Sequence, residues 1–164
     1  VYKRQDLTLD LVDQYTPLIL FDREEPFLPL VAGYTVFRKD GDSPSFPRSI
    51  QLAEAGRPTA ALVIEYAIWW DWDIKHLYEL EHFWTYVDDL GNAIYAEGSW
   101  HGFFGPMRME DGLTLCETHP IIYSQPGKHA FAPSPKVFLE HKEDCARSCL
   151  EAVSYTHLTL PTKA

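Results

Sequence analysis

The chain has 164 residues, of which 46% are hydrophobic and 14% aromatic, and its formal net charge at pH 7 is −10. This composition predicts one globular domain with a substantial core and excludes a disordered chain. The negative charge disfavours nucleic acid and anionic membrane surfaces as general partners, because both require basic patches. No apolar run approaches the roughly 18 residues of a membrane-spanning helix, so no transmembrane segment is expected.

The N-terminal sequence and the number of cysteines indicate the cellular compartment of the protein. Basic residues in the first ten positions are not followed by an apolar segment, which is unlike a secretory signal. The chain begins without Met, so the natural start is expected to be missing. Cys116, Cys145 and Cys149 are too few for a disulfide scaffold and predict free thiols in a reducing compartment. We therefore expect a cytoplasmic protein.

The first predicted element is a helix. Residues 6–16 place apolar side chains one helical turn apart, with Asp6 as a candidate cap and an end before Pro17. Short apolar or β-branched runs then alternate with segments rich in Gly, Pro and Asp, including a loop at 39–47. The strands predicted in this half of the chain lie at 18–21, 33–37, 49–52 and 60–70.

The central strands are predicted from hydrophobic runs and turn residues. The run at 60–70 contains one charged residue, Glu65, and is typical of a strand buried on both faces. Residues 79–87 form the next predicted strand, and the turn sequence Asp-Asp-Leu-Gly-Asn indicates a hairpin with 93–96. The remaining predictions are an irregular segment at 103–118, a strand at 119–124 and a helix at 139–152.

Strands joined by short turns dominate this pattern. It predicts a mainly β fold, an antiparallel β-sandwich of jelly-roll-like type with short terminal helices, formed by residues 1–152. Residues 153–164 do not continue the helical pattern and resemble a tail produced by sequencing-adapter read-through. We expect this tail to be non-native and the natural C-terminus to be missing.

The stretch 64–84 holds four of the five tryptophans and a group of side chains that bind metal or move protons: Asp71, Asp73, His76, Glu79, Glu81 and His82. On a strand that begins at Glu79, Glu79 and Glu81 share one face, about 7 Å apart, followed by apolar residues. Buried carboxylates without a partner are costly, so these two are expected to hold a cation. Carboxylate oxygen with histidine nitrogen suits Zn, Mn, Fe or Mg. The alternative is a surface strand with solvated charges.

Several motifs resemble known families. His-Leu-Tyr-Glu-Leu-Glu-His at 76–82 resembles the His-x-Gly-Asp-Trp-Glu-His motif of a family described as vacuolar protein sorting-associated. It is also similar to the Gly-His-Arg-His-Asp-Trp-Glu heptad of necrosis-inducing proteins. Further landmarks follow the same order: Tyr-Thr-Pro at 15–17 with Glu-x-x-x-Pro at 25–29, the aromatic run at 66–70, Ser-Trp-His-Gly at 99–102, and the segment 119–131. The resemblance covers residues 15–131.

The resemblance implies a β-sandwich with a divalent-cation pocket. The ligands that it implies are Asp73, His76, Glu79 and Glu81, with Asp71 as the alternative to Asp73. Two departures matter: Glu79 stands where the family has Asp, and Leu80 stands where it has Trp. For that reason the toxin activity of the necrosis-inducing proteins is not carried over. The cation is not distinguished among Mg, Mn, Ca and Zn.

His101 and His129 are candidate catalytic residues. Each lies within two residues of a glycine, where a backbone turn can aim an imidazole into a pocket. If both reach the acidic site, they could serve as general acid or base toward a metal-bound water. The alternative is a structural histidine bonded to its loop. Ser99 as a nucleophile lacks the Gly-x-Ser-x-Gly sequence and carries little weight.

Two functions remain open at this point. The first is a metal-dependent hydrolase acting on a small or carbohydrate-like substrate. The second is a binding module in which a structural cation and exposed tryptophans hold a glycan or a lipid headgroup. Trp69, Trp70 and Trp72 cannot all point inward from one strand, so an exposed aromatic is expected. Coordination distinguishes the two, since an enzyme keeps an open position for water and a structural site is closed by protein ligands.

Overall fold

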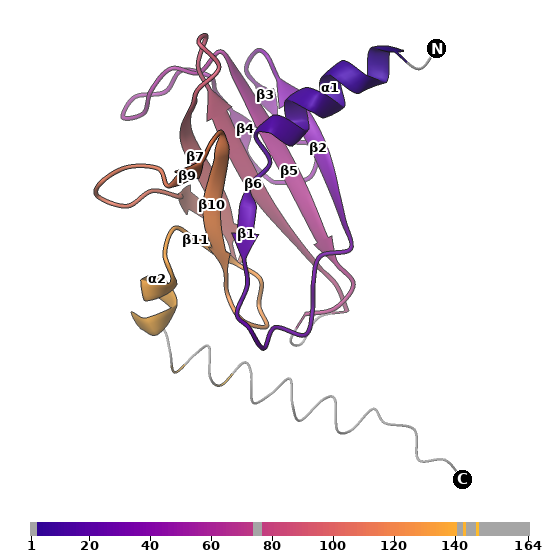
Figure 1. The fold of residues 1–164 in the computed structure, drawn as a ribbon, viewed down its shortest axis with the longest axis vertical. Coiled ribbons are helices and arrows are strands. Elements are labelled where there is room, and N and C mark those ends of the chain that lie inside the picture. The colour runs from indigo at the N-terminus through magenta and orange to yellow at the C-terminus, as the bar shows by residue number, and fades with distance from the viewer. Residues whose placement is uncertain (1–2, 74–76, 141–142, 144–146, 148–164) are drawn as a thin grey trace.

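The computed structural model describes residues 3–73, 77–140, 143 and 147, and Figure 1 shows their arrangement in two facing sheets. The larger sheet has the order β2-β5-β6-β7-β8, with every neighbouring pair antiparallel. Its strands are β2 (Val31–Phe37), β5 (Leu62–Trp70), β6 (Glu79–Val87), β7 (Ala93–Trp100) and β8 (Phe103–Pro106).

The smaller sheet has the order β1-β10-β11, with β9 paired to the other end of β10. Its strands are β1 (Leu18–Leu20), β9 (Leu115–Cys116), β10 (His119–Ser124) and β11 (Phe131–Ala132). The β1–β10 pair is parallel, whereas β10 pairs antiparallel with β9 and β11. A separate hairpin joins β3 (Gly41–Asp42) to β4 (Ser49–Ile50).

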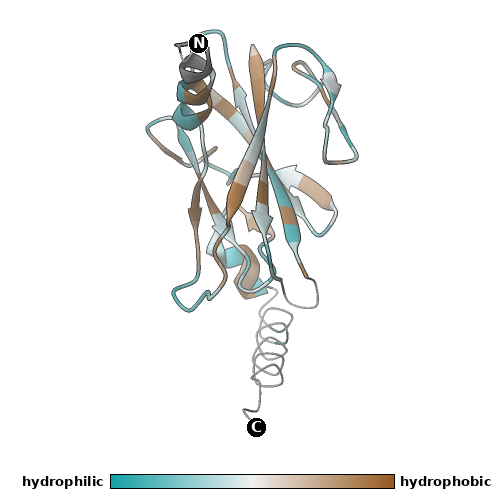
Figure 2. Cartoon of the chain, turned by 90° about the vertical axis from the view of Figure 1, so that its right-hand side faces the viewer, coloured by the Kyte–Doolittle hydropathy of each residue, from teal (hydrophilic) through white to brown (hydrophobic). Residues whose placement is uncertain are grey.

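Two short helices complete the described fold. Figure 2 shows α1 (Lys3–Gln14) at one end of the sandwich and α2 (Pro135–Glu140) at the other, with apolar segments along the strands between them. The predicted mainly β sandwich with short terminal helices is confirmed, and β1–β10 is the parallel exception. Within the described residues, no helix combines the length and apolarity needed to cross a membrane.

Three predicted segments differ clearly from the structure. The first helix begins at Lys3, so Asp6 lies inside it and is not its cap. The second helix begins at Pro135, a residue that the first turn accepts because its missing N–H would have no helical partner there. The segment 103–118 contains β8 and β9, because His101 and Gly102, with φ of 46° and 84°, reverse the chain and pair β8 with β7.

Some predictions lie outside the described residues. The tail at 153–164, most of the predicted helix beyond residue 140, and Cys145 and Cys149 belong to this group. Cys116 on β9 is an exposed free thiol, as expected.

β5 is the central strand of the fold and is buried on both faces, as predicted. Its side chains on one face, such as Ile64, pack with Ile122 and Phe131 of the smaller sheet. On the other face, Val63 packs with Ile50 of the β3–β4 hairpin. The molecule therefore has an inner core between the sheets and an outer apolar layer beneath the hairpin.

A buried ion pair fixes the hairpin over this outer layer. The guanidinium of Arg48, with 6% of the side chain exposed, lies 2.8 Å from Oε2 of Glu97. The Tyr86 hydroxyl donates to the same oxygen at 2.6 Å. The guanidinium also lies over the rings of Trp84 and Phe104, at 4.5 and 3.7 Å from the ring centroids. Arg48 thus forms an ion pair and also packs on two aromatic rings.

Gly98 on β7 lies at a close approach between the sheets. An ideal Cβ at this position would lie 3.0 Å from Cβ of Phe131 and 3.0 Å from Cε of Met107. Gly105, its partner across β7 and β8, has no heavy atom within 4 Å of such a Cβ. The two paired glycines therefore differ in packing although both lie in strands.

We expect Gly98→Ala to lower the free energy of unfolding by about 1–3 kcal/mol, because the Phe131 backbone would have to shift. Gly105→Ala is expected to be neutral or slightly stabilising, since it meets open space. Urea unfolding of the two variants measures both effects. Equal stabilities would contradict the close approach at Gly98.

Candidate cation site

The predicted alternation along β6 is confirmed. Phe83 and Val87 pack into the inner core, whereas Trp84 and Tyr86 lie in the outer layer. Glu81 is on the same face as Phe83 and is only 3% exposed. The inner core therefore ends, at the start of β6, in a buried carboxyl group.

Asp73 joins Glu81 from the bend after β5. Asp73 is fully buried, whereas Asp71, the alternative ligand, is exposed. Nζ of Lys128 donates to Oδ2 of Asp73 at 2.5 Å, and Nδ1 of His129 lies 3.8 Å from Oδ1. The turn between β10 and β11 thus presents a lysine and a histidine to this aspartate.

His129 is held in place beside the acidic cluster, which is formed by Asp73 and Glu81. It is fully buried, and its imidazole stacks on Trp70 with 4.6 Å between centroids and 8° between planes. Its backbone has a φ of 61°, in the left-handed region. Nε2 lies 3.6 Å from Oε1 of Glu25, and neither ring nitrogen has a hydrogen-bond partner among the described residues. The ring is therefore held between two carboxylates, those of Glu25 and Asp73.

Glu25 was not predicted as a site residue. It lies in the segment between β1 and β2, and its carboxylate accepts the backbone N–H of Gly127 at 2.7 Å and that of Phe27 at 3.1 Å. Burial raises the pKa of Glu25, but His129 and the two N–H groups outweigh burial and hold it below its ordinary value. The sequence signal was the Glu-x-x-x-Pro landmark, in which Glu25 is the glutamate.

The environment of Glu81 favours its protonated form. Burial is the largest cause and raises its pKa to about 8, with the charges of Glu79 and Asp73 acting in the same direction. The hydrogen bond from Ser99 and the charge of Lys128 oppose this rise. Oγ of Ser99 also accepts the backbone N–H of His82 at 2.6 Å, which fixes the hydroxyl beside the carboxyl. Ser99 is thus a hydrogen-bond partner of Glu81.

The other predicted site residues are distributed as follows. Glu79 is half-buried at the start of β6, and its Oε1 accepts the N–H of Leu80 at 3.1 Å. His101 lies in the β7–β8 turn, where its Nε2 is 2.9 Å from Oε1 of Gln125. The structure therefore brings His129, and not His101, into contact with a carboxylate of the cluster. His76 lies outside the described residues.

His82 belongs to the opposite face of β6. Its Nε2 lies 2.8 Å from Oγ of Ser45, beside the outer aromatic layer. Burial lowers its pKa to about 4, so the imidazole is neutral at neutral pH. His82 accordingly cannot share a ligand set with Glu81.

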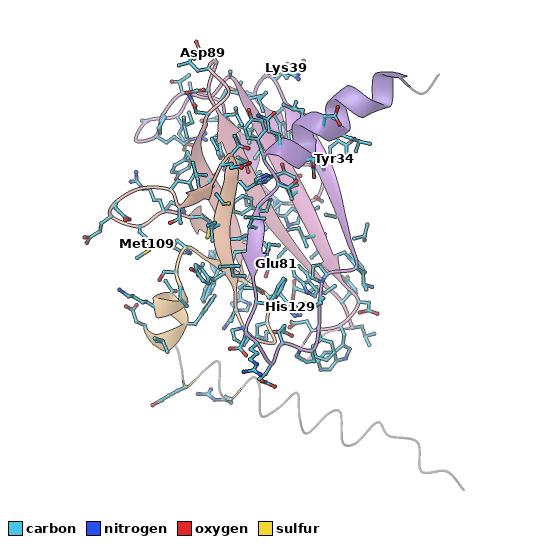
Figure 3. The ribbon with its side chains drawn as sticks, in the orientation of Figure 1. Tyr34, Lys39, Glu81, Asp89, Met109 and His129 are labelled. Atoms are coloured by element: carbon cyan, nitrogen blue, oxygen red, sulfur yellow. The ribbon has the colours of Figure 1, made fainter. Side chains whose placement is uncertain are left out.

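Figure 3 labels Glu81 and His129, which lie far along the sandwich from Lys39 and Asp89. In the part of the chain that the structure describes, no group of three or more His, Cys, Asp and Glu side chains is arranged to hold a metal ion. The Lys128 ammonium lies on one oxygen of Asp73, and the Ser99 hydroxyl bonds the Glu81 carboxyl. Asp73 and Glu81 therefore lie near each other, but they do not form a closed coordination shell.

Aromatic side chains surround this end of the sandwich. Trp69 stacks on Tyr78 with 4.8 Å between centroids and 8° between planes, and Tyr78 is 57% exposed. Trp72 is half-buried against Phe27, at 4.5 Å between centroids. Trp70, paired with Glu79 across β5 and β6, is buried. The expected exposed tryptophan is not found among these three, since Trp69 and Trp72 are half-buried and Trp70 is buried; the exposed aromatic is Tyr78.

No family model, curated protein or solved structure matches this chain. The resemblance to the vacuolar protein sorting-associated family and to necrosis-inducing proteins therefore stays a prediction.

Proposed function

We propose that this chain is a cation-binding β-sandwich module in which Asp73 and Glu81, with Glu79 beside them, hold a divalent cation. The supporting observation is the Glu81 carboxyl, which is buried near two further acids that disfavour its ionisation. A divalent cation would allow Glu81 to ionise in place, which removes the cost of burying like charges together. Carboxylate oxygens are the preferred ligands of Mg²⁺, Ca²⁺ and Mn²⁺.

Burial favours a binding role over hydrolysis. Asp73, Glu81 and His129 are all buried, whereas a metal-dependent hydrolase needs a coordination position that water and substrate can reach. The exposed Tyr78, stacked on Trp69, provides a flat aromatic face for a glycan-like ligand at the same end of the fold. In this proposal the cation orders the loop end of the sandwich and the aromatic pair contacts the ligand.

A hydrolase is the second candidate, and one observation favours it. A carboxyl with a pKa of about 8, as at Glu81, carries a proton at neutral pH and is suited to act as a general acid. Such a role would require substrate to approach Glu81 directly. Hydrolysis of chromogenic glycosides or esters that Glu81→Gln abolishes would favour this candidate over the binding module.

Calorimetric titration with Mg²⁺, Ca²⁺, Mn²⁺ and Zn²⁺ tests the cation. We expect the wild-type protein to bind one divalent cation, and Glu81→Gln to weaken that binding by at least about tenfold, because one charged ligand is lost. Glu110→Gln is the matched control, since it removes the same charge from an exposed loop position. Equal affinities in wild type and Glu81→Gln, or no binding at all, would exclude this site.

A further inference from the structure

The acidic cluster already contains a cation supplied by the chain itself. Nζ of Lys128 lies 2.5 Å from Oδ2 of Asp73, and the lysine side chain is 14% exposed. The positive charge of Lys128 also acts on Glu81. A lysine ammonium is a compact charge on a flexible stem, so it can occupy a carboxylate and leave it without movement of the backbone.

The turn that carries Lys128 is itself held firmly. The N–H groups of Gln125 and His129 donate to Ala130 and Gln125 carbonyls at 2.8 and 2.9 Å, and the N–H of Gly127 donates to Glu25. His129 is stacked on Trp70. The Lys128 side chain keeps 14% of its surface exposed, so it is the part of this turn best able to move.

His129 points to a ligand beyond the lysine. It is fully buried and aimed at Asp73 and Glu25, yet both of its ring nitrogens lie beyond hydrogen-bond distance of any acceptor in the described residues. Buried polar atoms are normally satisfied by a partner, an ordered water or an ion. Around His129, the described residues therefore supply fewer hydrogen-bond partners than its two buried ring nitrogens could use.

A divalent cation on Asp73 would lie within a few ångströms of the ammonium that now occupies the same carboxylate. Two positive charges at about 4 Å repel strongly where water is excluded, and the repulsion doubles when one charge is divalent. We infer that Lys128 is a built-in competitor, which holds Asp73 in the cation-free protein and swings outward when a divalent cation binds. This inference rests on the proposed function and adds a regulating residue to the same site.

The exchange has a consequence for the whole module. In the cation-free state Lys128 neutralises Asp73, so this buried carboxylate has a counter-charge. The affinity for a divalent cation then depends on how much more favourably Asp73 binds that cation than the Lys128 ammonium, and not on the acids alone. A site of this kind takes up divalent cations only above a concentration that the lysine sets.

Affinity measurements on Lys128→Gln test the competition, with Lys39→Gln as the control. Lys39 is exposed and lies toward the opposite end of the sandwich (Figure 3), so it changes net charge equally without touching the cluster. We expect Lys128→Gln to bind Ca²⁺ or Mn²⁺ about tenfold more tightly than wild type, or more, and Lys39→Gln to match wild type. Binding by Lys128→Gln alone would also support the inference.

Equal affinities in wild type and Lys128→Gln would overturn the competition and leave the proposed cation site standing. No binding in either protein would overturn both.

Chemical acetylation of the wild-type protein gives a second readout that needs no variant. If the ammonium leaves Asp73, the acetylation rate of Lys128, measured by mass spectrometry, should rise severalfold on addition of Ca²⁺ or Mn²⁺, while that of Lys39 stays constant. A Lys128 that remains protected in the cation-bound protein would overturn the exchange, whatever the affinities.

Discussion

Arg48→Ala is expected to lower the free energy of unfolding by about 3–5 kcal/mol, the usual cost of removing one partner of a buried ion pair. Arg48 and Glu97 have side chains that are 6% and 9% exposed, and their charged atoms lie 2.8 Å apart. Without the guanidinium, Glu97 would keep the hydrogen bond from Tyr86 but would have lost its buried counter-charge. The contacts with Trp84 and Phe104 would be lost as well.

Arg23→Ala is the matched control for this experiment. The Arg23 side chain is 94% exposed and its Nε lies 3.9 Å from Oε1 of Glu24, which is 88% exposed, so its removal should change stability by less than about 0.5 kcal/mol. Urea unfolding followed by tryptophan fluorescence measures both variants. If Arg48→Ala were no less stable than Arg23→Ala, the ion pair could not be what fixes the β3–β4 hairpin to the sheet.

The second large effect is a loss of stability with rising pH that Glu81 causes. Its pKa is raised from 4.5 to about 8 in the folded protein, so the folded state retains a proton that the unfolded state has released. This contribution is fully present below pH 4.5 and is lost as the pH rises through about 8. A pKa difference of this size corresponds to about 4–5 kcal/mol in the cation-free protein.

Glu81→Gln isolates this contribution, because the amide keeps a neutral group beside Ser99 at every pH. We expect the stability of wild type to fall relative to Glu81→Gln between about pH 5 and 8.5. Glu25 contributes in the opposite direction and at lower pH, since its lowered pKa gives stability that is lost on acidification, and it is unchanged in the variant. Parallel pH profiles for the two proteins would show that Glu81 titrates normally.

A saturating divalent cation should reverse the trend, because it favours the ionised carboxylate. The pH profile and the cation titration therefore test the same carboxyl group: the first follows its protonated form, and the second follows its ionised form.

The strands were predictable where the pattern was local. β6 and β10 have the predicted bounds, because alternation and turn residues define them without reference to other segments. β8 was not predicted, since its Phe103 is exposed and the strand exists through pairing with β7. The outer layer beneath the β3–β4 hairpin was also missed, because the loop at 39–47 has turn composition and no periodicity.

The candidate site was predictable in part for the same reason. A period of two places Glu79 and Glu81 on one face of β6, which the sequence alone defines. The preference for Asp73 over Asp71 came from the resemblance and not from periodicity, because the bend after β5 has no period. Glu25 bonds the N–H of Gly127, and Lys128 bonds Asp73, across long stretches of chain, so these contacts exist only in the folded protein.

An anomalous difference map from crystals grown with saturating Mn²⁺ tests the central claim most directly. We predict a peak at about 2–2.6 Å from carboxylate oxygens of Asp73 and Glu81, the range of bonds to hard divalent cations, with Nζ of Lys128 moved away from Asp73. A map without density between these two carboxylates, in which Lys128 still bonds Asp73, would contradict the claim. The cluster would then be an ion network neutralised by its own lysine.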